Sequence, residues 1–183
     1  MTPEIAVIVQ RASARRQVLE GLLDALPGEY WEQRAPGDSW SVRNHVEHLA
    51  TVDRPLVSLL EDAHRGATEC WLGGPGAGAL LDAREAGMVA LAGVEARELR
   101  LLLRRERAAV ESALAALPPS ACDCTVRIAG AIGSGGEPAA WPLRTYLASW
   151  AEHDGLHEAA IRVAIAAPPD LATVMLVRAA RSG

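Results

Sequence analysis

Four long segments with helical periodicity constrain the fold of this chain more than any other feature of its sequence. They cover residues 3–26, 41–64, 83–117 and 142–166, and proline or glycine closely follows each of them. In the second segment apolar residues recur at helical steps and form one apolar face: Val42, Val46, Leu49, Leu56 and Leu60. Four amphipathic helices without a strong strand signal predict an all-α fold, a four-helix bundle with long connecting loops.

Local signals refine the limits of these segments. Thr2 and Ser41 are suitable N-cap residues for the first and second helices. Pro55 lies inside the second segment, where we expect a kink or an early break. Gly87 and Gly93 weaken the first half of the third segment, so its second half, residues 95–117, is the stronger helix prediction.

Length and composition favour one domain that includes residues 1–183. The chain has 183 residues, half of them hydrophobic, which is enough for a substantial core and too little for two independent domains. Its apolar residues are mostly Leu, Ala and Val, with no Phe, and this composition favours helices over sheets. The connections 66–80 and 130–138 are rich in glycine, and residues 124–132 alternate weakly enough to predict at most a short hairpin.

Charge and targeting signals exclude several classes of partner. The net charge of −5 argues against nucleic acid, and the arginines of residues 97–107 alternate with glutamates, which predicts a solvated, ion-paired helix face. No segment has the roughly 18 apolar residues of a membrane span, and no secretory leader is evident, so we expect a cytoplasmic protein. Three cysteines cannot form a fully paired disulfide framework, and Cys122 and Cys124 lack the second Cys or His pair of a metal site.

Two histidines in the fourth segment have the spacing of a metal-ligand pair. His157 follows His153 by four positions, which places both imidazoles on one face of a helix. The intervening Asp154-Gly155-Leu156 lacks the glutamate of the H-E-x-x-H motif, so the sequence does not indicate a zinc protease. The alternative is that both are buried histidines whose nitrogens bond to a neighbouring helix.

A third ligand would come from another helix, and the residues leave two choices. His45 and His48 lie one turn apart in the second segment. His45 is nearer the middle of the apolar face, but with Ser41 as N-cap it also occupies the position that packs against Trp40 in a hydrophobic staple. His48 lies at the flank of the apolar face, as His153 does in its own helix. Physical arguments alone leave the two histidines nearly equal.

Two short motifs resemble the DinB/YfiT-like family of metalloenzymes. Residues 40–50, WSVRNHVEHLA, look like the W-S-x(6)-H-L motif that opens the family's second helix. Residues 150–157, WAEHDGLH, look like the H-x(3)-H motif of its last helix. The order of the motifs, their separation and four helices over nearly the whole chain also fit, so the resemblance implies a bundle of the DinB/YfiT type.

The resemblance implies that His48, His153 and His157 are the metal ligands. It selects His48 because this residue follows the tryptophan of the W-S pair by eight positions. Family members often carry Gln-Ile shortly after the last histidine, whereas this chain has Ala160-Ile161, so any role of that glutamine is lost or moved. Three neutral imidazoles suit Zn²⁺ or Ni²⁺ best, are compatible with Fe²⁺, and leave coordination positions open.

The resemblance also implies a function. Some relatives are S-transferases or isomerases that use mycothiol or bacillithiol, so we expect a metal-dependent enzyme for a small molecule, either a low-molecular-weight-thiol S-transferase or a hydrolase. The alternative is a non-catalytic stress protein whose metal stabilises the bundle. Four carboxylates are near enough in sequence to orient ligands or move protons: Glu47, Asp53, Glu152 and Asp154. A homodimer is expected from the resemblance and from the frequency of symmetric dimers.

Overall fold

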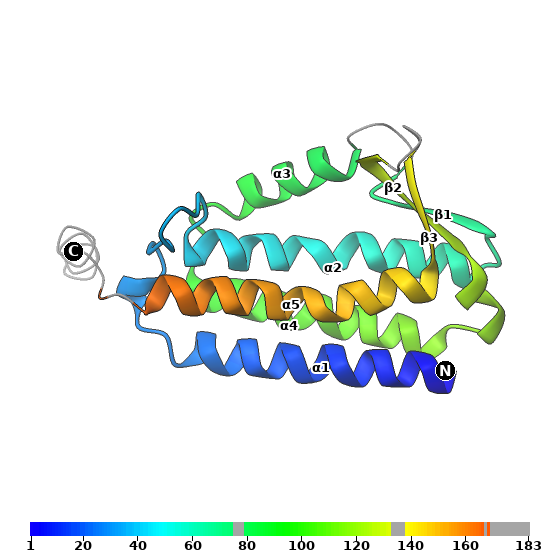
Figure 1. Cartoon of the computed structure of the whole chain (residues 1–183), viewed down its shortest axis with the longest axis horizontal. Coiled ribbons are helices and arrows are strands. Elements are labelled where there is room, and N and C mark those ends of the chain that lie inside the picture. The colour runs from blue at the N-terminus through cyan, green and yellow to red at the C-terminus, as the bar shows by residue number, and fades with distance from the viewer. Residues whose placement is uncertain (75–78, 133–137, 167, 169–183) are drawn as a thin grey trace.

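Four long helices lie side by side in the computed structural model, which describes residues 1–74, 79–132, 138–166 and 168. They are α1 (Pro3–Asp24), α2 (Val42–His64), α4 (Ala96–Ala116) and α5 (Leu143–Ile165). A shorter helix, α3 (Ala79–Leu91), lies outside this group above α2 (Figure 1). Short 3-10 turns occupy Gly28–Tyr30 and Pro119–Asp123. The predicted helical bundle is present, with a fifth helix packed on it.

Side-chain caps fix where the first two helices begin. The Oγ1 atom of Thr2 accepts a hydrogen bond of 3.3 Å from the backbone N–H of Ile5. Ser41 caps α2 reciprocally with Asn44, because each side chain accepts from the other residue's backbone N–H. Both N-caps were predicted and are confirmed. The predicted early break at Pro55 is wrong, since α2 continues through this residue to His64.

The third predicted segment consists of two helices rather than one. Residues 92–95 separate α3 from α4, and Gly93 has a φ of +82°, a left-handed conformation that favours glycine. Gly87 allows α3 to approach α2 closely, because a Cβ atom there would lie 2.8 Å from Cγ2 of Thr51. The two glycines that weakened this helix prediction therefore have separate roles, one ending α3 and one packing it.

A three-stranded sheet beside the bundle corrects the all-α prediction. Its strands are β1 (Glu69–Leu72), β2 (Thr125–Ile132) and β3 (Pro138–Pro142), in the order β1-β2-β3. β1 pairs in parallel with β2, with Glu69 opposite Thr125, and β2 pairs antiparallel with β3, with Val126 opposite Trp141. The short hairpin expected within residues 124–132 is wrong, because this segment is a single strand whose hairpin partner is β3.

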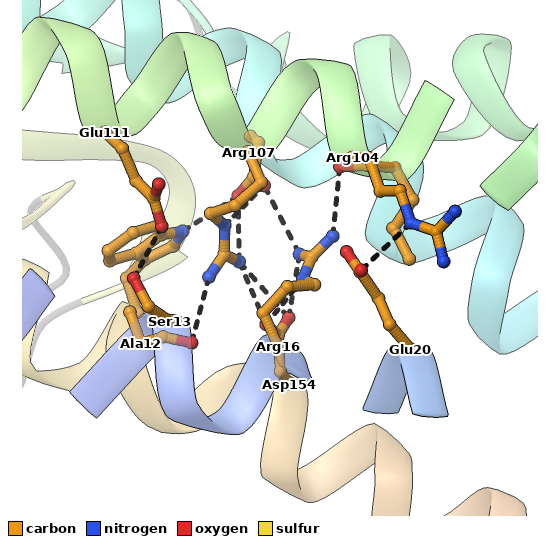
Figure 2. Close-up of polar contacts among 11 residues, drawn as sticks. Ala12, Ser13, Arg16, Glu20, Arg104, Arg107, Glu111 and Asp154 are labelled. Atoms are coloured by element: carbon orange, nitrogen blue, oxygen red, sulfur yellow. Dashed lines mark hydrogen bonds and ion pairs between the residues drawn. The ribbon is translucent and has the colours of Figure 1, made fainter. Parts of the chain in front are cut away.

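The bundle core contains a cluster of four charged side chains. Arg16 of α1, Asp53 of α2, Arg107 of α4 and Asp154 of α5 are all at most 5% exposed. Figure 2 shows Arg16, Arg107 and Asp154 of this group, in which Arg16 Nε lies 2.8 Å from Asp154 Oδ2. Arg107 Nε lies 2.9 Å from Oδ2 of Asp53. We call these four residues the buried ion cluster. Its two positive and two negative charges balance, as buried charges require.

The solvated face predicted for residues 97–107 holds for the exposed Arg97, Arg104 and Arg105, and the buried ion cluster corrects it at Arg107. Arg107 faces the core, and its neighbour Glu106 is also buried. Other arginines of α4 pair across to α1, as Arg104 does with Glu20 at 2.9 Å (Figure 2). The alternation of Arg and Glu therefore reflects contacts between helices more than pairs within one. In the described part of the chain, no helix is both long and apolar enough to cross a bilayer.

Candidate metal centre

Three histidines from two bundle helices converge on one point. His48 comes from α2, and His153 and His157 lie one turn apart on α5. One ring nitrogen from each lies within 4.8 Å of the other two. The Nε2 atom of His153 is 3.4 Å from Nε2 of His48 and 3.3 Å from Nε2 of His157. The structure thus brings together the three residues that the sequence motifs selected.

Two of the three nitrogen–nitrogen distances, 3.4 Å and 3.3 Å, match those between ligands around a tetrahedral metal ion. Two imidazole nitrogens that bind Zn²⁺ at about 2.0–2.1 Å are about 3.3 Å apart at the tetrahedral angle. His48 is 2% exposed, and its Nδ1 atom has no hydrogen-bond partner within the described residues. Three uncharged imidazoles in partial burial are a donor set that Zn²⁺ and Ni²⁺ accept. The residues present therefore fit a metal ion.

Burial holds these histidines in the form that binds metal. Desolvation is the main cause that lowers the pKa of His48 to about 2 and that of His157 to about 3. The pKa of His153 is also lowered, again mainly by burial. Repulsion from neighbouring histidines and from Arg84 adds to the shifts of His48 and His157. At neutral pH the three imidazoles are uncharged, as coordination requires.

His45 is not one of the three converging histidines, but it contacts one of them, His157. Its Nδ1 atom lies 2.9 Å from Nδ1 of His157, and its Nε2 atom lies 3.3 Å from Oδ2 of Asp38. Both hydrogen bonds form when Nδ1–H of His157 donates to Nδ1 of His45 and Nε2–H of His45 donates to Oδ2 of Asp38. Such a contact fixes a ligand's tautomer and ring orientation. His45 also meets the Trp40 ring, with centroids 5.4 Å apart, as the predicted staple requires.

The centre lies at the wall of a pocket of about 260 Å³. His48 and His153 both line it. The rest of the lining is mostly apolar and comes from α2, α3, α5 and the sheet, including Val52, Pro55, Leu72, Ile128, Tyr146 and Trp150. A small molecule in this pocket would lie beside the ligand nitrogens. The arrangement therefore combines a metal-ligand set with an adjoining binding space.

The protein family of this chain follows from its similarity to known families. The sequence profile of the DinB superfamily matches residues 11–161. The chain belongs to the DinB superfamily. No curated protein matches it at a significant level.

Two solved structures share the fold of this chain over most of its length. The crystal structure of a mycothiol-dependent maleylpyruvate isomerase aligns with a TM-score of 0.66 at 16% identity, covering 88% of this chain. A histidine mutant of a mycothiol-dependent maleylpyruvate isomerase gives the same TM-score and coverage at 14% identity. This DinB superfamily member spans 63% of the length of those chains. At such identities the alignments show a shared fold.

The four carboxylates considered from the sequence lie elsewhere in this DinB superfamily protein. Asp53 and Asp154 belong to the buried ion cluster. Glu152 is on the surface, where it pairs with two arginines of α1, and Glu47 is buried and accepts from the Asn44 side chain. Within the described residues, none of the four belongs to the ligand group or lines the pocket. Asp38, which reaches the ligand His157 only through His45, was not predicted.

The cysteines form no metal-binding group in the described part of the chain. Cys70, Cys122 and Cys124 are buried free thiols, and the Cys124 Sγ atom contacts Sγ of Cys70 at 2.9 Å. Burial and the hydrogen bond to Cys124 raise the pKa of the Cys70 thiol to about 12, which disfavours the thiolate that a metal needs. The three cysteines belong to one of the hydrophobic core clusters.

We expect a His45→Phe variant to bind metal about 10–100-fold more weakly than wild type, because such supporting contacts typically contribute this much. Phenylalanine keeps a ring against Trp40 but removes the hydrogen bond to His157. Competition with a chromophoric chelator measures the affinity. His64→Phe is the control, since His64 is exposed and contacts the carbonyl oxygen of Ala116. Equal affinities for the two variants would show that His45 does not support the centre.

Proposed function

We propose that this protein is a metal-dependent enzyme that acts on a small molecule together with a low-molecular-weight thiol, as an S-transferase or an isomerase does. One observation carries the proposal: the three converging histidine nitrogens lie at the wall of a pocket. A structural metal site is usually closed by four protein ligands, whereas a catalytic one keeps a position open for water or substrate. Three ligands beside a pocket favour the second arrangement.

In this proposal each residue has a defined task. His48, His153 and His157 hold the ion, with Zn²⁺ or Ni²⁺ preferred and Fe²⁺ compatible. His45, held by Asp38, keeps the ring of His157 in the orientation that presents Nε2. When bound, the ion would lower the pKa of a thiol and so supply a nucleophile near neutral pH. The apolar pocket walls would limit the access of water to that thiol.

The similar solved structures support the participation of a low-molecular-weight thiol in the proposed reaction. They are crystal structures of a mycothiol-dependent maleylpyruvate isomerase, and they share the fold of this chain. Since this chain spans 63% of their length, the thiol and the reaction are both part of our proposal. Zn²⁺ and Ni²⁺ as the preferred ions, and the homodimer expected from the resemblance, also stay predictions.

Metal content tests the proposal directly. Protein purified without an affinity tag is expected to contain nearly one equivalent of metal by elemental mass spectrometry. His48→Ala and His157→Ala each remove one of three ligands and are expected to lose nearly all of it. The control His64→Ala removes an exposed histidine outside the centre and is expected to keep the metal. Wild-type protein that binds no metal, even after Zn²⁺ or Ni²⁺ is supplied, would refute the metal-dependent function.

Cobalt substitution then separates the thiol-dependent enzyme from the alternatives. Adding 2-mercaptoethanol to the Co²⁺-loaded protein is expected to produce a thiolate-to-cobalt charge-transfer band in the near ultraviolet. A loaded protein that shows no such band but hydrolyses esters would be a hydrolase. A loaded protein with neither property would be the non-catalytic, metal-stabilised bundle.

A further inference from the structure

Among the described residues that line the pocket beside the metal centre, one carries a formal charge, the guanidinium of Arg84 in α3. Its other lining residues are apolar, hydroxyl-bearing or, for His48 and His153, uncharged histidines. Within the part of the chain that the structure describes, no aspartate or glutamate lines the pocket. An otherwise uncharged pocket with a single cation has a net positive potential, which attracts anions.

Arg84 has no acidic partner within the described residues. None of the ion pairs found there includes this side chain, although the other half-buried or buried arginines nearby, Arg43 and Arg107, each pair with a carboxylate. Its guanidinium lies 6.0 Å from the centroid of the Trp40 ring, a cation–π contact. This contact is compatible with further hydrogen bonds, because it leaves the edges of the guanidinium available.

Trp40 places this cation close to the metal ligands. The Trp40 ring centroid is 5.0 Å from that of His48 and 5.9 Å from that of His157. Arg84 therefore lies on the side of the pocket where the ligand nitrogens converge. A ligand that reaches both features needs to be no longer than a small organic molecule.

We propose that Arg84 binds a carboxylate group of the ligand, and that the pocket therefore takes a small carboxylate with an apolar or aromatic body. A guanidinium matches a carboxylate with two parallel hydrogen bonds. The described lining residues supply one positive charge, which balances a carboxylate monoanion but not a phosphate dianion. The pocket volume of about 260 Å³ lies below the range of drug-sized ligands and suits a body of about one ring.

The assignment of this carboxylate to the substrate rests on the function proposed above. The contact between Arg84 and a carboxylate requires no metal. Isothermal titration of metal-free protein with benzoate, and with the uncharged analogue benzamide, therefore tests it independently. Arg84→Gln removes the cation, and Arg97→Gln is the matched control. Arg97 is an exposed arginine of α4 outside the pocket lining, and its substitution makes the same change in net charge.

Wild type and Arg84→Gln are expected to differ in a defined way. Wild type should bind benzoate at least about tenfold more tightly than benzamide, because a charge-assisted pair typically contributes this much. Arg84→Gln should lose the preference while keeping its affinity for benzamide, which shows that the pocket is intact. Arg97→Gln should behave as wild type does.

Three results would overturn the inference. They are an absence of benzoate binding to wild type, equal binding of benzoate and benzamide, and a preference that persists in Arg84→Gln. Phenyl phosphate binding more tightly than benzoate would overturn the choice of carboxylate. Failure of the proposed function would appear separately, as wild-type protein without metal, and would leave the result with benzoate unaffected.

Discussion

An Asp53→Asn variant is expected to have a free energy of unfolding about 3–5 kcal/mol below that of wild type, the usual cost of breaking a buried ion pair from one side. Asp53 accepts from three residues of three other helices. Arg107 Nε and Trp150 Nε1 each lie 2.9 Å away, and an Arg16 nitrogen lies 3.3 Å away. The substitution preserves shape but leaves two buried arginines opposite a single carboxylate (Figure 2). Urea unfolding followed by circular dichroism measures the loss.

A surface variant and a double variant control this prediction. Glu152→Gln breaks two ion pairs with Arg11 and Arg15, but the side chains are about half exposed, so we expect a change of about 0–1 kcal/mol. Combining Asp53→Asn with Arg16→Gln restores the balance of charge and should cost less than the sum of the two single changes. An Asp53→Asn variant as stable as Glu152→Gln would show that the buried ion cluster does not stabilise the bundle.

Acid is expected to destabilise the metal-free protein well before its carboxylates are protonated. The pKa values of about 2 for His48 and about 3 for His157 in the folded state lie below the ordinary value of 6.5. Between the folded-state pKa values and the ordinary value, the unfolded chain binds more protons than the folded one. The free energy of unfolding therefore decreases as the pH falls. The stability contributed by the two neutral histidines is fully present above about pH 6.5 and is lost progressively below that pH. Each histidine contributes up to about 1.4 kcal/mol per pH unit, hence about 2–3 kcal/mol per unit for both.

Comparison with a double variant isolates this contribution. His48→Gln combined with His157→Gln cannot take up these protons, so the difference in slope from wild type between pH 6 and pH 5 reports the two histidines. Urea unfolding of chelator-treated protein at each pH supplies the free energies. Equal slopes would mean that the two imidazoles accept protons in the folded state, and that burial does not keep them neutral.

Sequence periodicity predicted the bundle well because its signals are local. Three of the four long helices begin where Thr2, Ser41 and the Pro142 region indicated, since caps and proline positions are set within a few residues. The two His-containing motifs also lie within single helices, so their spacing specified which side chains share a face. The association of His48 with His153 and His157 required the family resemblance, because the residues alone left His45 as an equal choice.

The features that the sequence did not predict depend on distant pairing. The four-residue strand β1 lies in a connection that looked irregular, and it forms because Glu69–Leu72 pairs with residues 125–128. Arg107 looked like its neighbours on α4, and only the opposing Asp53 and Asp154 explain why it is buried. Arg84 had no signal of its own, because its importance comes from the pocket that α3 helps to enclose.

The buried ion cluster also favours one alignment of the bundle helices along their axes. Its Leu- and Ala-rich helix faces would still pack if a helix slid by one turn, about 5.4 Å. The same slide would separate that helix's charge from its partners and leave it buried and unpaired. Asp53 follows His48 by five residues, and Asp154 adjoins His153. A chain that misaligns α2 or α5 while folding would therefore be unstable as well as unable to assemble the ligands, so incorrectly assembled protein should not persist to compete for metal.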